Sequence, residues 1–431
     1  MVNEGKMKFI KKNLIAFRTQ MISLGFLFVL FISMAVYWGC AQEKKEGLEL
    51  VVRTGLESEG LREVAEEFTN KHDIQVKISE LGRDGYLSAV PTQLLTGSAN
   101  FDVAFLPSTI IAELAKGEAL TPLDNKIDVK DLDLVSTYGY KQKIYALPCD
   151  ISTMFLYYRK DLIESPPQTW SEYLDVAKQF TKRVNPESPT EYGCALPGQA
   201  GEELPKAFYC LLWSYGGFII KDGKVGIGEP LSIEAAQFYR KLVDEKVLPQ
   251  DITSWGFSQI FENLENGKLA MAAPFWNAAA TFLLKSESLY ADKIEIALIP
   301  GVKQPDGDIK RVPFQHAWTL AVNSKSQNIE KAAQFVAYAT GKEGGRIYAK
   351  SVRGNPARYS ILKDPKLQDI RPEFKLLVES LELAKAEPAV PYYASLHNIM
   401  NEELTQIITK SKKPEQAMKD AGDRIKKLLN Q

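Results

Sequence analysis

The chain has 431 residues, with 53 Lys and Arg against 54 Asp and Glu, and 45% of its residues are hydrophobic. These near-average values argue against wholesale disorder and against a protein with many membrane spans, and the length allows two or three domains. The charge is unevenly distributed, because residues 1–20 hold five basic groups against Glu4 and residues 21–39 hold no charge. Residues 40–431 therefore carry 48 basic and 53 acidic groups, a net charge of −5. This mildly acidic body provides no electrostatic basis for binding nucleic acid.

The N-terminus has the pattern of a bacterial export signal. A basic stretch precedes the uncharged, mostly apolar run 21–38, and Gly39-Cys40 follows it. Such a run enters the bilayer while its basic flank stays in the cytoplasm. Gly39-Cys40 resembles a lipobox, with Tyr37 and Trp38 where that motif usually has Leu and a small residue.

Three interpretations of this segment follow. In the first, residues 1–39 are a lipoprotein signal peptide, Cys40 is lipidated, and residues 40–47 form a tether. The second is an uncleaved anchor helix, since the apolar run has a borderline length for one span. The third is ordinary cleavage after Ala35. All three place the body outside the cytoplasmic membrane, and the first anchors it to the cell membrane through the acyl chains of Cys40.

The remaining cysteines are Cys149, Cys194 and Cys210, an odd number for an oxidising compartment. No CxxC pair is present and the chain has only three His, which disfavours a zinc site. We expect buried free thiols and no metal or other cofactor. A Cys194–Cys210 disulfide stays open as the alternative.

The first hundred residues of the body alternate between strand and helix patterns. Period-two alternation or buried β-branched runs predict strands at 48–53, 74–78 and 101–106. Apolar residues at helical spacing predict helices at 59–71 and 86–95. This order of elements predicts a parallel sheet with crossover helices.

The same alternation continues along the chain. Helices are expected at 169–183, with Thr169 as the N-cap, at 232–245 and at 328–340, and strands at 270–273, 294–299 and 318–322. After Glu373 the pattern is helical to the end, with a break at 388–393. About 390 residues of repeated α/β units exceed one hydrophobic core. We therefore expect two lobes with a ligand at their interface.

Several ordered segments of the body resemble those of a known family. The segments, in one-letter code, are FDVA at 101–104, IYALPCD at 144–150, LYYRKDL at 156–162, PQTWSEYL at 167–174, WSYGG at 213–217, FENLENGKLAM at 261–271 and RGNPAR at 353–358. They resemble the extracellular solute-binding proteins of bacterial ATP-driven (ABC) importers, family 1, carbohydrate type. The resemblance extends over residues 48–431.

This resemblance implies a fold and a function. The fold is α/β, a two-lobed periplasmic-binding-protein fold of type II-like topology, with a mainly parallel sheet flanked by helices in each lobe and a ligand cleft between them. Lobe 1 would comprise 48–150 plus 300–355, and lobe 2 would comprise 151–299 plus 356–431. The implied function is to capture a mono- or oligosaccharide outside the cytoplasm by hinge closure, as a monomer, and to deliver it to the transmembrane subunits of the permease.

Sugar rings stack their C–H faces on aromatic rings, so the cleft should contain several Trp and Tyr. The aromatic candidates, placed partly by the resemblance, are Trp276, Trp318, Trp213, Tyr215 and Trp255. For each of them a role in the core or as a loop anchor is the alternative. Trp170 begins a helix and is expected in the core.

Hydroxyl groups of a sugar need hydrogen-bonding partners, and charged side chains provide strong ones. Glu57 and Glu59 follow the first strand, at the carboxyl end where open α/β sheets bind ligands. The resemblance adds Tyr86. Asp150 follows the Pro148 crossing and is a candidate in the hinge cleft, with a plain turn role as the alternative. Arg353 could bind a pair of hydroxyls or lie on the surface. Ser108 is a further candidate, at a place where sugar-binding members commonly carry an acidic residue.

Three other functions are alternatives to this one. The chain contains no GxSxG, HExxH or P-loop motif, which argues against an enzyme. The same fold binding another solute, such as a polyamine or a phosphate ester, is one alternative. A surface sensor that keeps the fold without transport is another.

Overall fold

The computed structural model of the chain describes residues 47–124, 128–132, 139–284, 286–350 and 354–429. The predicted signal peptide, Cys40, nearly all of the tether and Arg353 lie outside these ranges. Within them, no helix has both the length and the apolar character that a membrane span requires.

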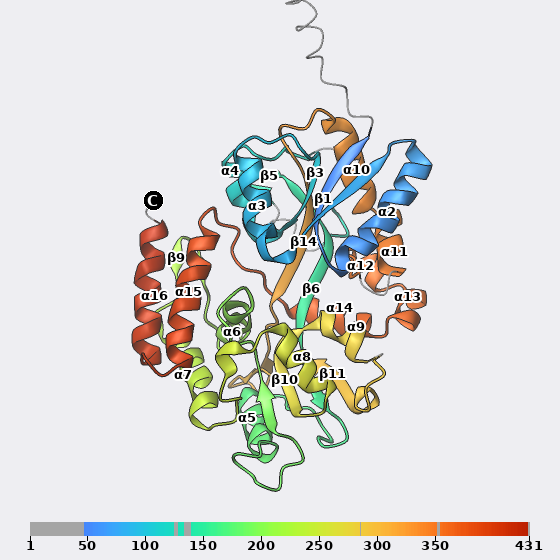
Figure 1. The fold of residues 1–431 in the computed structure, drawn as a ribbon. Coiled ribbons are helices and arrows are strands. Elements are labelled where there is room, and N and C mark those ends of the chain that lie inside the picture. Colours follow the sequence, from blue (N-terminus) through green and yellow to red (C-terminus); the bar gives the residue numbers. More distant parts are fainter. Residues whose placement is uncertain (1–46, 125–127, 133–138, 285, 351–353, 430–431) are drawn as a thin grey trace, which may run out of the picture. The chain divides into compact units, whose positions relative to one another are not determined.

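The first half-sheet is built from strands in the order β2-β1-β3-β14-β6 (Figure 1). Its members are β1 (Leu48–Arg53), β2 (Val76–Leu81), β3 (Val103–Pro107), β14 (Gln315–Val322) and the beginning of β6 (Ala146–Arg159). The connecting helices are α2 (Leu56–His72) and α3 (Arg83–Leu95). β1 pairs in parallel with both β2 and β3, which confirms the predicted crossover arrangement.

Strand β6 belongs to both halves of the sheet. From Ala146 to Thr153 it pairs with β14. From Met154 to Arg159 it pairs with β10 (Leu269–Trp276) and β11 (Ile294–Leu298). β7 (Tyr192–Ala195) pairs in parallel with β10 and completes the second half-sheet. One strand runs against the others in each half, β14 in the first and β6 in the second.

Helices cover both half-sheets. Along the first, α2 packs against α10 (Ile329–Ala339) and α11 (Lys342–Lys350), as Figure 1 shows. The helices of the second half are α5 (Trp170–Gln179), α6 (Glu203–Ser214), α7 (Pro230–Asp244), α8 (Phe257–Glu265), α9 (Ala280–Leu283), α14 (Glu373–Leu383), α15 (Tyr393–Ile408) and α16 (Pro414–Leu429). α15 packs against α6, α7 and α16. The two-lobed mixed α/β fold expected from the sequence is confirmed.

Local chemistry explains where several helices begin. Thr169 is the N-cap of α5, and its hydroxyl accepts from the backbone N–H of Glu172 while the Glu172 carboxylate accepts from the N–H of Thr169. This capping box satisfies two otherwise unpaired donors and confirms the predicted cap. Helix α7 begins at Pro230, two residues before the predicted start, because the fixed φ of Pro suits the first helical position.

The cysteines of the body are buried and free. Cys149, Cys194 and Cys210 form no disulfide, so the Cys194–Cys210 alternative is not realised. Burial raises the pKa of the Cys194 thiol to about 12. The described residues contain no cluster of His, Cys, Asp and Glu that could hold a metal ion.

Candidate functional site

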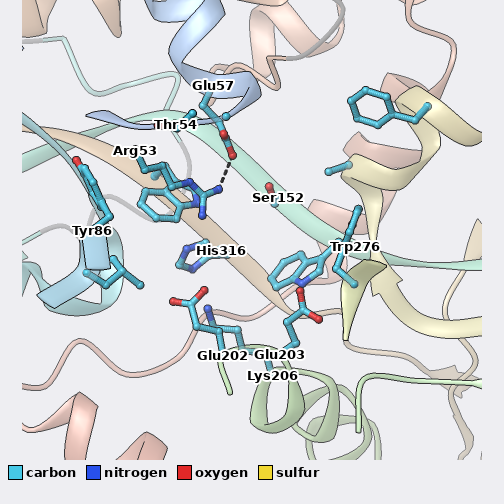
Figure 2. A pocket seen from close by; sticks show the side chains of 16 residues that line it. Arg53, Thr54, Glu57, Tyr86, Ser152, Glu202, Glu203, Lys206, Trp276 and His316 are labelled. Carbon is cyan, nitrogen blue, oxygen red and sulfur yellow. Dashed lines mark hydrogen bonds and ion pairs between the residues drawn. The ribbon is translucent and has the colours of Figure 1, made fainter. Parts of the chain in front are cut away.

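A cavity of about 660 Å³ is lined by residues of both half-sheets (Figure 2). The first half contributes side chains from β1, α2, α3 and β14, and the second contributes α6, α8, α9 and β10. The carboxyl end of β1 opens into this space, which is where open α/β sheets bind ligands. The cavity is therefore the candidate ligand site.

Arg53 closes one side of the cavity. Its Nη2 atom donates to Oε1 of Glu57 at 2.5 Å, and Glu57 stands in the first turn of α2, where the helix dipole favours a carboxylate. The Arg53 guanidinium carbon lies 3.9 Å from the ring centroid of Trp318. Phe105 stacks on the same indole at 4.8 Å. Two groups this close cannot share one face, so both faces of Trp318 are occupied.

The opposite side of the cavity is an aromatic wall. Trp276 ends β10 and is joined by Phe257 of α8 and Phe282 of α9. The Trp276 indole meets Phe314 edge to face at a centroid distance of 5.9 Å. His316 also meets the Trp276 indole edge to face. The indole is half-buried and lines the cavity. This wall provides apolar rings against which a sugar C–H face can pack.

Charged groups at the start of α6 face the same space. Figure 2 shows Glu202, Glu203 and Lys206 close to Trp276 and His316. Lys206 is only 3% exposed, and its ammonium lies 5.9 Å from the Trp276 ring centroid. The Lys206 ammonium lowers the pKa of Glu202 to about 2. Glu202 is therefore ionised at neutral pH, and the helix N-terminus favours its charge as well.

His316 lies in β14 between the charged groups and the aromatic wall. It is 5% exposed, and neither ring nitrogen has a hydrogen-bond partner among the described residues. The nearest counter-charge is Glu387, whose Oε1 lies 3.8 Å from Nδ1 of His316. Burial, and then the Lys206 ammonium, lowers the pKa of His316 below its ordinary value. A neutral imidazole offers one donor and one acceptor to a solute in the cavity.

Four residues selected from the sequence line the cavity: Trp276, Trp318, Glu57 and Tyr86. The hydroxyl of Tyr86 is already committed, because it donates to the backbone oxygens of Val51 and Phe105 at 3.1 and 2.5 Å. Only the ring of Tyr86 therefore remains to contact a solute.

The other selected residues lie elsewhere. Trp213 is buried in α6 and stacks on Phe314 at 5.8 Å. Trp255 is buried and donates from Nε1 to Asp251. Three further selected positions lie outside the cavity lining: Tyr215 after α6, Glu59 exposed on α2 and Ser108 buried after β3.

Asp150 lies near the cavity without lining it. It is buried in β6, and its Oδ2 accepts from the hydroxyl of Tyr348 at 2.9 Å and from the backbone N–H of Asn355 at 3.0 Å. Arg371, itself 1% exposed, donates to the side chain of Asn355. These bonds tie the central strand to α11 and to the segment that follows it.

Most of the charged lining is not evident from the sequence. The unselected residues with polar side chains are Arg53, Thr54, Ser152, Glu202, Glu203, Lys206 and His316. The position of Arg53 could have indicated its role, because Arg53 ends β1, and the candidates Glu57 and Glu59 were chosen because they follow that strand.

The chain was compared with known proteins. The model of the family described as bacterial extracellular solute-binding protein matches residues 54–346. A probable amino-acid ABC transporter periplasmic-binding protein of Sinorhizobium fredii is 24% identical, over 89% of each chain. A galactooligosaccharide-binding protein of Bacillus subtilis is 23% identical, over 90% of each chain. The maltose-bound MalE3 structure of T. maritima superposes with a TM-score of 0.76 at 25% identity, covering 89% of this chain and 99% of the other.

Proposed function

The chain belongs to the family of bacterial extracellular solute-binding proteins, and from this premise we propose that it captures a mono- or oligosaccharide for an ABC importer. The observation that carries the proposal is the cavity itself. An aromatic wall of Phe257, Trp276 and Phe282 faces hydrogen-bonding groups on the other side. This combination suits a sugar, which has apolar faces and a rim of hydroxyls. The names of the Bacillus and T. maritima proteins, which refer to galactooligosaccharide and maltose, support it.

The proposed mechanism is closure around the solute. A solute that contacts both halves favours the closed form by its differential affinity for that form. The proposed lobes are 48–150 plus 300–355 and 151–299 plus 356–431. The exchange of strand partners along β6 supports a hinge in this region, since β6 runs without a break through both halves. The closed form would deliver the solute to the transmembrane subunits of a permease.

The family is extracellular, and we propose further that lipidated Cys40 anchors the protein to the outer side of the cell membrane. The basic and apolar segment that ends in Gly39-Cys40 supports this anchoring. We also propose that the protein acts as a monomer and binds its solute without transforming it, which accords with a family of binding proteins.

A thermal-shift screen followed by calorimetry tests the proposal. The panel contains neutral and acidic mono- and disaccharides, maltooligosaccharides, polyamines and the common amino acids. We expect a saccharide to raise the melting temperature and to bind with about micromolar Kd, equivalent to about −8 kcal/mol. Binding of an amino acid or polyamine with no response to any saccharide would contradict the saccharide assignment.

A further inference from the structure

Lys206 is a nearly buried cation that faces the cavity. Lys206 is 3% exposed and belongs to the cavity lining. The small exposed part of this side chain therefore faces the cavity. Its ammonium lies 5.9 Å from the ring centroid of Trp276 and 5.8 Å from that of Phe314. Among the described residues the ammonium donates no hydrogen bond and has no carboxylate within 4.0 Å, and the hydrogen bond that Lys206 accepts is at its backbone oxygen.

The other cation of the cavity is differently placed. Arg53 already has its counter-charge, because its Nη2 is 2.5 Å from the Glu57 carboxylate. Its guanidinium also lies over Trp318. A solute that used Arg53 would have to displace Glu57, whereas Lys206 is available without breaking an ion pair.

The carboxylate that Lys206 influences most clearly is Glu202, the N-cap of α6, which stands about one helical turn before it. Their electrostatic coupling is strong, since Lys206 is the main cause of the lowered pKa of Glu202. However, the Glu202 side chain is exposed, so water solvates its charge, and the N-terminus of α6 stabilises it independently of Lys206. Glu202 can therefore turn towards solvent when another anion approaches the ammonium.

A buried ammonium is costly unless a counter-ion or hydrogen bonds compensate for the water it has lost. The two aromatic rings compensate only in part. We infer that Lys206 binds an anionic group of the solute, a carboxylate, phosphate or sulfate, and that the captured saccharide is therefore acidic. This inference rests on the proposed saccharide-binding function and deepens it.

The neighbours of Lys206 fit such a solute. A sugar ring packed on Trp276 would bring its substituents close to the ammonium, because the two groups line the same part of the cavity (Figure 2). His316 carries no charge when neutral and can donate a hydrogen bond to an anionic oxygen. The Lys206 ammonium would then gain a direct charge-assisted hydrogen bond, which it does not form with Glu202.

Calorimetry on matched pairs of probes tests the inference. The probes are galactobiose against digalacturonate, and glucose against glucose 6-phosphate and glucose 6-sulfate, which separate the three anionic groups. The protein variants are the wild type, Lys206→Met, Lys206→Arg and Lys241→Met, the last an exposed lysine of α7 outside the cavity. We expect at least one acidic probe to bind tenfold or more tightly than its neutral partner. Lys206→Met should abolish that preference, Lys206→Arg should retain part of it, and Lys241→Met should leave it unchanged.

Different outcomes separate the inference from the function on which it rests. If neutral probes bind as tightly as acidic ones, and Lys206→Met lowers both affinities equally or neither, the inference is overturned and the proposed function stands. If no saccharide of the wider panel binds, the proposed function fails and the inference fails with it. Thermal melts of each variant verify folding. If Lys206→Met does not fold, the wild type and Lys206→Arg decide. The inference is then overturned if no acidic probe binds the wild type more tightly than its neutral partner, or if Lys206→Arg leaves the affinity for the acidic probe unchanged.

Discussion

The guanidinium of Arg53 covers the indole of Trp318, with 3.9 Å between the guanidinium carbon and the ring centroid. The same guanidinium holds Glu57 at 2.5 Å. Arg53 therefore covers one face of Trp318 and also neutralises the Glu57 carboxylate. Trp318, which the sequence suggested as a stacking residue, offers its edge to the cavity while Arg53 stays in place.

Replacing Arg53 with Ala should expose this face of Trp318 and leave Glu57 without its counter-ion. A cation–π contact contributes about 1 kcal/mol, so we expect the free energy of unfolding to fall by about 1–2 kcal/mol. The tryptophan emission should shift to the red. Urea unfolding and fluorescence measure the two effects. Arg62→Ala, which removes an exposed pair with Glu80, is the control and should change stability by less than about 1 kcal/mol. Equal losses in the two variants would contradict the special role of Arg53.

Two tryptophans proposed from the sequence as ligand contacts should respond differently to truncation. Trp276→Ala removes a half-buried ring of the cavity wall and should weaken saccharide binding at least tenfold with a small change in stability. Trp213→Ala removes a buried ring that stacks on Phe314 and should lower the free energy of unfolding by about 3–5 kcal/mol. Calorimetry and urea unfolding of both variants provide the comparison. Unchanged affinity in Trp276→Ala would remove this residue from the site.

Asp150 should make stability depend on pH. Burial, and then the charge of Glu57, raises the pKa of Asp150 to about 7 from an ordinary value of 3.8. Between these two values the folded state binds more protons than the unfolded state, so the free energy of unfolding falls as pH rises from about 4 to about 7. Each unit of pKa shift corresponds to about 1.4 kcal/mol, which gives a total of a few kcal/mol.

Asp150→Asn removes this titration while its amide oxygen can still accept from Tyr348 and Asn355. The stability of the variant relative to the wild type should therefore increase between pH 4 and pH 7 and level off above pH 7. Urea unfolding at several pH values measures the difference. Asp175→Asn, a change at an exposed carboxylate of α5, should follow the wild-type curve. Parallel curves for Asp150→Asn and the wild type would show that the carboxyl does not retain its proton.

The three body thiols should be inert in the folded protein. Cys149, Cys194 and Cys210 are fully or almost fully buried, and burial raises the pKa of Cys194 to about 12. Thiolate is the reactive form, so iodoacetamide at pH 8 should label none of the three without denaturant and all three in urea. Peptide mass spectrometry locates the label. Rapid labelling of the native protein at any of these positions would show that it is accessible.

The elements with strong local signals could be predicted from the sequence. Residues 48–53 alternate clearly and form β1 with the predicted bounds, and Thr169 caps α5 because its hydroxyl and Glu172 satisfy each other locally. β6 was harder to recognise as one strand. Pro148, Cys149 and Asp150 interrupt its apolar pattern, and Pro usually marks an edge or an end of a strand.

The charged half of the site could not be predicted because long-range packing creates it. Lys206 lies on a helix whose remaining residues are mostly core, and nothing local marks it as facing a cavity. His316 comes to Lys206 from a strand more than a hundred residues later. The two tryptophans show the same limit. Trp213 and Trp276 both contact Phe314, and tertiary packing buries the first while it leaves the second half-buried.

The continuity of β6 also governs how the body unfolds. Residues 146–153 of this strand are bonded in one half-sheet and residues 154–159 in the other, with no loop between them. If one half-sheet unfolds, its part of β6 loses its strand partners, and the other part of β6 becomes exposed where the two halves meet. The two halves should therefore melt together, in a single calorimetric transition with equal van't Hoff and calorimetric enthalpies.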